Sequence, residues 1–337
     1  MVHGGALSIG VIAALSSADE KFRVWDAFWR NDRLHSFCND SDVQTPQTLE
    51  KYWAGVVRRL ASGSRVLDVA CGNGAVGYAM ARAAHVMGGS LAITGIDEAA
   101  IDPPRYLPNH ADILRGIEFR SRTPMETLPF ENGTFDAVVS QYGFEFGTAP
   151  TALSEAARVI KPQGLLTFLA LPAHSPAAQA AKKAVKQARY LLRDASLFND
   201  AFSIIQAFHE GPTDTREQKI RADLEQFNVV VEKAVAQFDA SESDVVFAII
   251  IGLNQVFVDR KTVPGEKQLM AIETVRTGLA QYAARAQATT KAALNDANLE
   301  NLKRSITTAG FKLLETRSLL VSGQGTIAWQ LTAERLP

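Results

Sequence analysis

Residues 66–77 read VLDVACGNGAVG, an apolar run that passes into a glycine-rich turn. The spacing Gly72-x-Gly74-x-x-Gly77 lets a backbone approach a ligand closely, and a helix that starts there offers free N–H groups. Dinucleotide-binding turns share this spacing, so the glycines alone do not identify the ligand. Asp68, four residues before the first glycine, is more informative, because a carboxylate does nothing for an anionic pyrophosphate. The turn is better suited to a ligand that carries positive charge.

Length and composition set wide limits on the protein. With 337 residues, 47% of them hydrophobic and 21% charged, the chain has material for two domains or for one domain with a large insertion. The formal net charge of -1 gives no basic field of the kind that gathers nucleic acid. Cys38 and Cys71 cannot form a disulfide framework, and no spacing suggests a metal site, so we expect a cytoplasmic protein without a metal.

The N-terminal stretch GGALSIGVIAAL, residues 4–15, is apolar but is too short for a membrane span and lacks a basic segment before it. We predict that it begins a packed helix and that the chain has no membrane span. Aromatic residues at helical spacing follow, and they extend the predicted N-terminal helical cap over 1–62.

Strand and helix patterns alternate after residue 63. Strands are predicted at 64–70, 90–97, 117–121, 134–141 and 164–171, with helices at 75–84 and 151–161 between them. Two further strands, 312–322 and 326–334, are joined by Gly323-Gln324-Gly325, which predicts an antiparallel hairpin. The expected fold is α/β, a Rossmann-like doubly wound sheet of seven strands that closes with this hairpin, formed by 63–172 and 296–337.

Residues 173–295 show helical patterns only, which predicts a large all-helical insertion. One segment carries an apolar stripe formed by Ile220, Leu224, Phe227, Val231 and Phe238. Such stripes need partners. The insertion is therefore expected to pack on itself, on the sheet domain or on a second copy of the chain.

The polar residues of the α/β region fall at or just after the ends of predicted strands. Ligands bind at this edge of parallel sheets. S-adenosylmethionine presents an α-ammonium and a sulfonium near such a turn, and both favour a nearby carboxylate such as Asp68. A closing hairpin is also not a feature of a standard dinucleotide domain.

Residues 64–171 and 296–333 resemble a class I S-adenosylmethionine-dependent methyltransferase. Within that class they are similar to the group that contains the ubiquinone/menaquinone-biosynthesis enzymes. The matching stretches are VLDVACGNG, TGIDEA, METLPFENGTFDAVVSQYGFEF, EAARVIKPQGLLTF and the end AGF…AWQLTA. The resemblance covers somewhat under half of the chain and includes neither the N-terminal helices nor the insertion.

The resemblance implies a set of residues that bind the cofactor, with S-adenosylhomocysteine as the product. Asp68 would serve the α-ammonium, and Gly72 and Gly74 would form the floor under the methionine portion, with Ala70 and Asn73 of the same turn also binding the cofactor. Asp97 would hold the ribose hydroxyls, Glu98 would flank the adenine and Met125 would contact it. Gln141 would lie beside the sulfonium. Relatives have an acid that bonds the adenine amino group where this chain has Pro124. Glu126 is the substitute that we expect for it.

Several residues are candidates for the substrate side. Tyr142, Phe144 and Phe146 follow the fourth strand and are expected in the substrate pocket, as is His35. Trp29 either packs the N-terminal helices or walls that pocket. His174 follows the fifth strand, and a neutral imidazole there would serve as a general base for a hydroxyl acceptor.

The sequence thus predicts transfer of a methyl group to a small, partly apolar molecule, with oxygen, nitrogen and carbon all open as the acceptor atom. The alternative is a non-catalytic cofactor-binding protein whose insertion binds a protein partner. A dinucleotide oxidoreductase is disfavoured by Asp68. The insertion is expected to cap the pocket, to set substrate choice or to form a homodimer, and no nucleic-acid partner is expected.

Overall fold

A computed structural model describes residues 18–31, 33–37, 43–194, 196–211, 213–242 and 244–337. The apolar stretch 4–15 and Cys38 lie outside these ranges. The chain divides into two compact units, Met1–Ala178 with Ala292–Pro337, and Gln179–Lys291. We call them the sheet unit and the helical unit, and each is described by itself.

The sheet unit contains a seven-stranded sheet in the order β3-β2-β1-β4-β5-β7-β6. Its strands are β1 (Arg65–Val69), β2 (Ala92–Ile96), β3 (Glu118–Arg120), β4 (Phe135–Gln141), β5 (Ile160–Ala170), β6 (Phe311–Val321) and β7 (Gly325–Arg335). The first five run parallel. β7 pairs antiparallel with both β5 and β6. The predicted α/β sheet with its closing hairpin is therefore confirmed.

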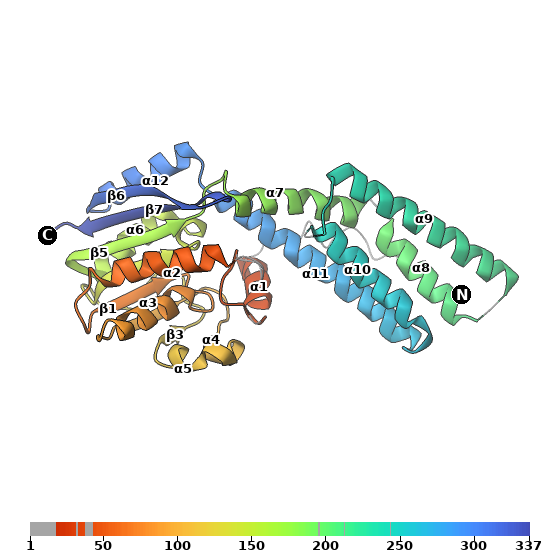
Figure 1. Cartoon of the computed structure of the whole chain (residues 1–337), viewed down its shortest axis with the longest axis horizontal. Helices are drawn as coiled ribbons and strands as arrows, with labels where there is room; N and C mark the ends of the chain where they lie inside the picture. Colours follow the sequence, from red (N-terminus) through yellow and green to blue (C-terminus); the bar gives the residue numbers. More distant parts are fainter. Residues whose placement is uncertain (1–17, 32, 38–42, 195, 212, 243) are drawn as a thin grey trace. The chain divides into compact units, whose positions relative to one another are not determined.

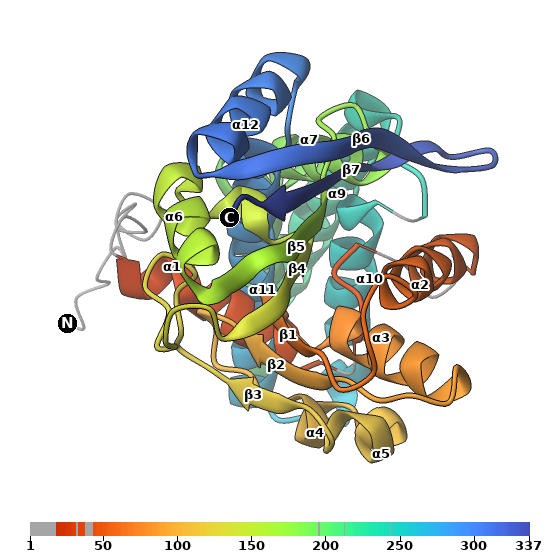
Figure 2. The same ribbon diagram turned by 90° about the vertical axis from the view of Figure 1, so that its left-hand side faces the viewer.

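Helices cover both faces of this sheet (Figure 2). The helices of this unit are α1 (Ala18–Trp29), α2 (Gln44–Val57), α3 (Ala75–Val86), α4 (Pro103–Tyr106), α5 (Ala111–Leu114), α6 (Ala149–Val159) and α12 (Asp296–Thr308), with short 3₁₀ turns η2 (Pro108–His110) and η3 (Phe144–Phe146). Successive strand residues point to opposite faces. Val66 accordingly joins the core under α2 and α3, whereas Leu67 joins the core under α6 and α12.

The helical unit lies between two parts of the sheet unit in the sequence (Figure 1). It is formed by α7 (Pro176–Arg189), the π-helical turn η4 (Tyr190–Asp194), α8 (Leu197–His209), α9 (Asp214–Phe238), α10 (Val245–Val258), the 3₁₀ turn η5 (Asp259–Lys261) and α11 (Gly265–Ala292), of which α7 and α11 contain the division points. Its core includes Phe227, Val230 and Ala234 of α9. Of the predicted stripe, Phe227 is buried and Ile220, Val231 and Phe238 pack against this core, whereas Leu224 is exposed. The roles predicted for this insertion stay predictions.

In the described part of the chain, no helix combines the length and the apolar character that a membrane crossing needs.

Candidate functional site

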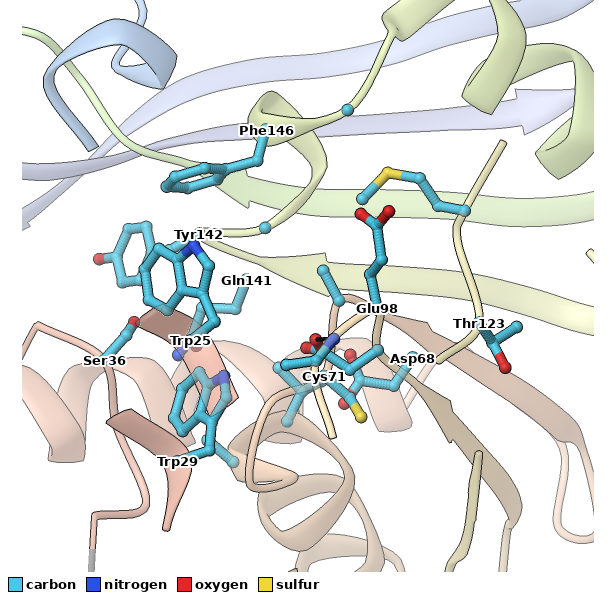
Figure 3. Close-up of a pocket in the computed structure, with 18 of the residues that line it drawn as sticks. Trp25, Trp29, Ser36, Asp68, Cys71, Glu98, Thr123, Gln141, Tyr142 and Phe146 are labelled. Atoms are coloured by element: carbon cyan, nitrogen blue, oxygen red, sulfur yellow. Dashed lines mark hydrogen bonds between the residues drawn. The ribbon is translucent and has the colours of Figure 1, made fainter. Parts of the chain in front are cut away.

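A cavity of about 280 Å³ opens at the carboxyl ends of β1, β2 and β4 (Figure 3). That volume is close to the lower end of the range of small-molecule pockets, about 300–1,000 Å³. The lining residues are Trp25, Trp29, Leu34, Ser36, Asp68, Ala70, Cys71, Ala75, Val76, Asp97, Glu98, Ala99, Thr123, Met125, Glu126, Gln141, Tyr142, Gly143, Phe146, Gly147 and Thr148. Every one of them belongs to the sheet unit.

The turn after β1 has an unusual backbone. Ala70, Gly72 and Gly74 have positive φ angles of 53°, 53° and 80°. For a residue with a Cβ such as Ala70, this conformation costs about 1–3 kcal/mol, and such strain is concentrated at binding and catalytic sites. The Cys71 N–H donates to the carbonyl of Ile96 over 2.9 Å, which ties the turn to the end of β2.

The glycines of the turn are needed for packing more than for lining. A Cβ on Gly72 would lie 2.3 Å from Cζ2 of Trp29, so the indole rests directly on this glycine. A Cβ on Gly74 would lie 2.7 Å from Cζ of Phe119, and one on Gly77 would lie 3.0 Å from Cδ1 of Ile117. None of the three glycines lines the cavity.

Asp68 is a buried carboxyl group at the floor of the cavity. Its side chain is 1% exposed, and neither oxygen accepts a hydrogen bond of normal geometry from a described residue. Burial raises the pKa of Asp68 well above its ordinary value, and the Asp97 carboxylate raises it further, while the Gly77 N–H acts in the opposite direction. A buried carboxyl without partners is costly unless a cation or donor from a ligand completes it.

Asp97, at the end of β2, is also buried but has partners. Its Oδ2 accepts the N–H of Gly72 and its Oδ1 accepts the N–H of Ala99, both over 2.8 Å. Burial raises the pKa of Asp97 to about 6, although both hydrogen bonds oppose the shift. Each oxygen keeps a lone pair, so the carboxylate is held in place and can still accept from a ligand.

Glu98, Met125 and Glu126 form the side of the cavity beyond β2. Figure 3 shows the Glu98 side chain pointing from the end of β2 into the pocket. Glu126 is differently placed, because its Oε1 accepts the N–H of Thr148 over 2.7 Å at the start of α6. This hydrogen bond holds the loop after β3 against the N-terminus of α6. A helix N-terminus favours a negative charge such as that of Glu126.

Gln141 and Tyr142 end β4 and both line the cavity. The Gln141 Oε1 accepts the indole N–H of Trp53 over 2.8 Å, so α2 sets the orientation of the amide. Tyr142 has a φ of 54°, and its hydroxyl donates to the carbonyl of Ile327 over 3.1 Å. The backbone strain and the hydrogen bond together fix the ring at the pocket wall.

Six predicted site residues do not line this cavity, and two of them are the turn glycines Gly72 and Gly74. Phe144 lies in the core, where its ring stacks on Phe168 with centroids 4.7 Å apart. His174 is exposed, and its ring packs against Trp329.

Asn73 and His35 are the other two. The Asn73 amide is fully buried and donates to the carbonyls of Trp29 and Arg33 over 2.9 and 2.8 Å. It therefore holds the N-terminal segment on the turn. His35 is half-buried in that same segment.

The cavity also contains residues that the sequence did not single out, among them Leu34, Ser36, Thr123, Gly147 and Thr148. Thr123 follows β3 and Thr148 precedes α6. The expectation that ligands bind at the carboxyl ends of parallel strands, which placed Asp97, could therefore have included both residues. Leu34 and Ser36 lie in an irregular segment with no periodic signal. Within the described ranges, no group of three or more His, Cys, Asp or Glu side chains is arranged to hold a metal ion.

Comparison with known proteins agrees with this geometry. Residues 66–164 match a family model described as a methyltransferase domain. The phthiotriol/phenolphthiotriol dimycocerosates methyltransferase of Mycobacterium leprae (strain TN) is 33% identical over 108 residues, which are 32% of this chain and 37% of the relative.

Two further relatives match over longer stretches. The 27-O-demethylrifamycin SV methyltransferase of Amycolatopsis mediterranei (strain S699) is 30% identical, with 45% of this chain and 56% of the relative covered. The ubiquinone biosynthesis O-methyltransferase of Xanthomonas oryzae pv. oryzae (strain PXO99A) is 33% identical, with 51% of this chain and 64% of the relative covered. The matches thus span from 37% to 64% of these relatives' own lengths.

The sheet topology, the glycine turn and the matched segment define the class of the sheet unit. Residues 66–164 of this unit match the methyltransferase domain, and the seven-stranded order with its closing hairpin is the one expected from the resemblance to class I methyltransferases.

Proposed function

We propose that the chain transfers a methyl group from S-adenosylmethionine to a small, partly apolar molecule. The observation that carries this proposal is Asp68, a buried carboxyl group without hydrogen-bond partners of normal geometry, at the floor of a cavity beside a glycine turn. A ligand with a primary ammonium group would satisfy it. The names of two relatives refer to a rifamycin and to dimycocerosates, and the third is named for ubiquinone biosynthesis, which supports a small-molecule acceptor.

The lining residues divide the work of holding this cofactor. Asp68 would pair with the α-ammonium group, and Asp97 would accept the ribose hydroxyls with the lone pairs that its two N–H donors leave. Glu98 and Met125 would lie against the adenine, and Gln141 would lie near the sulfur. When bound, S-adenosylmethionine supplies a methyl group that is activated by its sulfonium charge.

The chain would contribute alignment and exclusion of water to the reaction. Holding two reactants in line removes much of the entropic cost of a bimolecular step. A strong general base is needed only for a weakly acidic hydroxyl or for a carbon acceptor. The base role proposed for His174 gains no support from its position, because the residue is exposed and does not line the cavity.

For the helical unit we propose a role in substrate choice or in forming a homodimer, argued from its place in the sequence between β5 and α12. Light scattering after size-exclusion chromatography would measure the oligomeric state. A monomer at micromolar concentration would remove the dimer from this proposal.

Calorimetric titration with S-adenosylhomocysteine and with NAD tests the proposed cofactor. We expect binding of S-adenosylhomocysteine and none of NAD. Tight NAD binding without binding of S-adenosylhomocysteine would overturn the proposal. Cofactor binding without methyl transfer to any small acceptor would instead favour the non-catalytic alternative.

A further inference from the structure

The cavity has two chemically different halves (Figure 3). The aromatic half is formed by the rings of Trp25, Trp29, Tyr142 and Phe146. The acidic half contains the carboxyl groups of Asp68 and Glu98, which Figure 3 shows away from the rings, and Asp97 and Glu126 also line the cavity. The proposed cofactor contacts account for the acidic half and for Gln141. The aromatic half has no such assignment.

The rings of the aromatic half meet one another in defined orientations. Trp25 and Phe146 pack edge to face, with centroids 5.5 Å apart and planes at 90°. Trp25 and Trp29 lie nearly parallel, with centroids 6.3 Å apart and planes at 24°. Trp25 and Phe146 are only half-buried, and both line the cavity, so ring surface remains available for contact. Flat apolar surfaces of this kind favour a planar ring.

This wall is anchored from below, which keeps the rings in place. Asp26 accepts the N–H of Ala100 over 2.7 Å and pairs with Arg122 over 2.5 Å. One turn further along α1, the carbonyl of Trp29 accepts the amide of Asn73. A surface fixed in advance loses less conformational freedom when a ligand binds.

The charges that line the cavity all have one sign. It has four carboxyl groups, and among the described residues that line it there is no lysine, arginine or histidine. At close range in a partly buried site, repulsion between two like charges changes an equilibrium by about tenfold or more. A carboxylate or phosphate on the acceptor would meet this repulsion without a cationic side chain to offset it.

Methyl transfer to a neutral acceptor conserves charge within this lining. The acceptor's lone pair forms a bond to the methyl carbon while the carbon–sulfur bond breaks and its electrons stay on sulfur. The positive charge therefore moves from sulfur to a neutral acceptor, which releases a proton when the acceptor atom carried one. Carboxylates and ring faces stabilise a positive charge at both ends of that step.

We propose that the acceptor is a planar ring compound without negative charge, neutral or cationic, which binds against Trp25 and Phe146. This inference rests on the proposed function, because the acidic half is assigned to S-adenosylmethionine. It excludes carboxylates and phosphates as preferred acceptors.

Three naphthalene probes that differ in charge test the proposal on the full-length protein saturated with S-adenosylhomocysteine. They are naphthalene-2-carboxamide, 2-naphthylmethylamine and naphthalene-2-carboxylate. Binding is followed by ligand-observed NMR at pH about 7.5, at which the amine and the carboxylate are both fully charged. We expect the amide and the amine to bind about tenfold or more tightly than the carboxylate. Equal or tighter binding of the carboxylate would overturn the proposal, as would failure of the amide and the amine to bind up to their solubility.

Three variants locate the probes. Phe146→Leu should weaken the amide and the amine several-fold, whereas Phe130→Leu, whose ring packs on Phe135 outside the cavity, should leave their affinity unchanged. Ser36→Lys adds a cation beside the rings and should shift the carboxylate-to-amide affinity ratio by about tenfold toward the carboxylate. An unchanged ratio, or equal effects of the two phenylalanine variants, would refute the assignment.

The proposed function and this inference fail in different ways. Absence of S-adenosylhomocysteine binding to the wild-type protein would refute the proposed function. Normal cofactor binding with the wrong order of probes would refute the acceptor class alone.

Discussion

Replacement of Asp68 by asparagine tests the cofactor site most directly. The two side chains have nearly the same shape, and the wild-type carboxyl group is buried without hydrogen-bond partners of normal geometry, so the fold should tolerate the amide. The variant removes the negative charge that an α-ammonium group would meet. Hydrogen bonds to charged groups contribute about 1.5–3 kcal/mol, so S-adenosylhomocysteine should bind about 10- to 100-fold more weakly.

The pH dependence of binding sharpens this test. Burial raises the pKa of Asp68, so the ligand-free protein holds this group protonated over a wider pH range than an exposed aspartate. An ammonium partner would ionise the group, and binding would then release a proton. Wild-type affinity should therefore rise with pH, by up to about tenfold per unit below the raised pKa, whereas this dependence should be absent from Asp68→Asn.

Calorimetric titrations between pH 5 and 8, in buffers of different ionisation enthalpy, would measure both the affinity and the proton release. Asp136→Asn is the matched control, because Asp136 pairs with Lys161 over 2.6 Å and does not line the cavity. Parallel affinity curves for wild type and Asp68→Asn, or equal affinity at every pH, would refute the assigned role. Thermal unfolding of each variant would show that the comparison is between folded proteins.

Three further substitutions follow from the geometry of the site. The pKa of Asp97 is raised to about 6, so the unfolding free energy of the ligand-free protein should fall by up to about 3 kcal/mol as the pH rises from about 4 to 6. In urea unfolding, Asp97→Asn should show a weaker dependence on pH. Gly143→Ala should lower the melting temperature and abolish cofactor binding, because the new Cβ would lie 2.5 Å from that of Ala70, and a wild-type melting temperature would contradict this. Trp53→Phe removes the hydrogen bond to Gln141, so kcat should fall more than the affinity for S-adenosylhomocysteine does. Steady-state kinetics and calorimetry would measure the two quantities. A loss confined to affinity would count against the placement of Gln141 beside the sulfur.

The sheet was predictable because strand order follows from local patterns. Alternating strands and helices with short connections allow few arrangements, and Gly323 and Gly325, both with positive φ, fix the hairpin. The same logic placed Asp68, Asp97 and Gln141 at one edge, since the carboxyl ends of parallel strands meet there. These assignments depend on backbone topology, which the periodicity of hydrophobic residues in the sequence predicts.

Side-chain direction in loops was not predictable in this way. Phe144 and Phe146 both follow β4, but the 3₁₀ turn η3 directs the first into the core and the second into the cavity. That turn follows the positive φ of Tyr142, which no sequence pattern announces for a tyrosine. Similarly, nothing in the sequence indicates that the Asn73 amide binds the carbonyl of Trp29, a residue 44 positions away.

One electrostatic feature connects the cofactor and the acceptor. Asp68 and Asp97 lie buried on neighbouring strands, and each is a cost to the ligand-free fold, because burial disfavours their ionised forms. A dinucleotide would add the negative charge of its pyrophosphate to this edge, whereas a cofactor with ammonium and sulfonium groups would offset the carboxyl groups. The acceptor meets the same lining, which contains no basic side chain among its described residues. The carboxyl groups therefore disfavour NAD at the turn, and the described lining offers no cationic side chain to an anionic acceptor beside the aromatic rings.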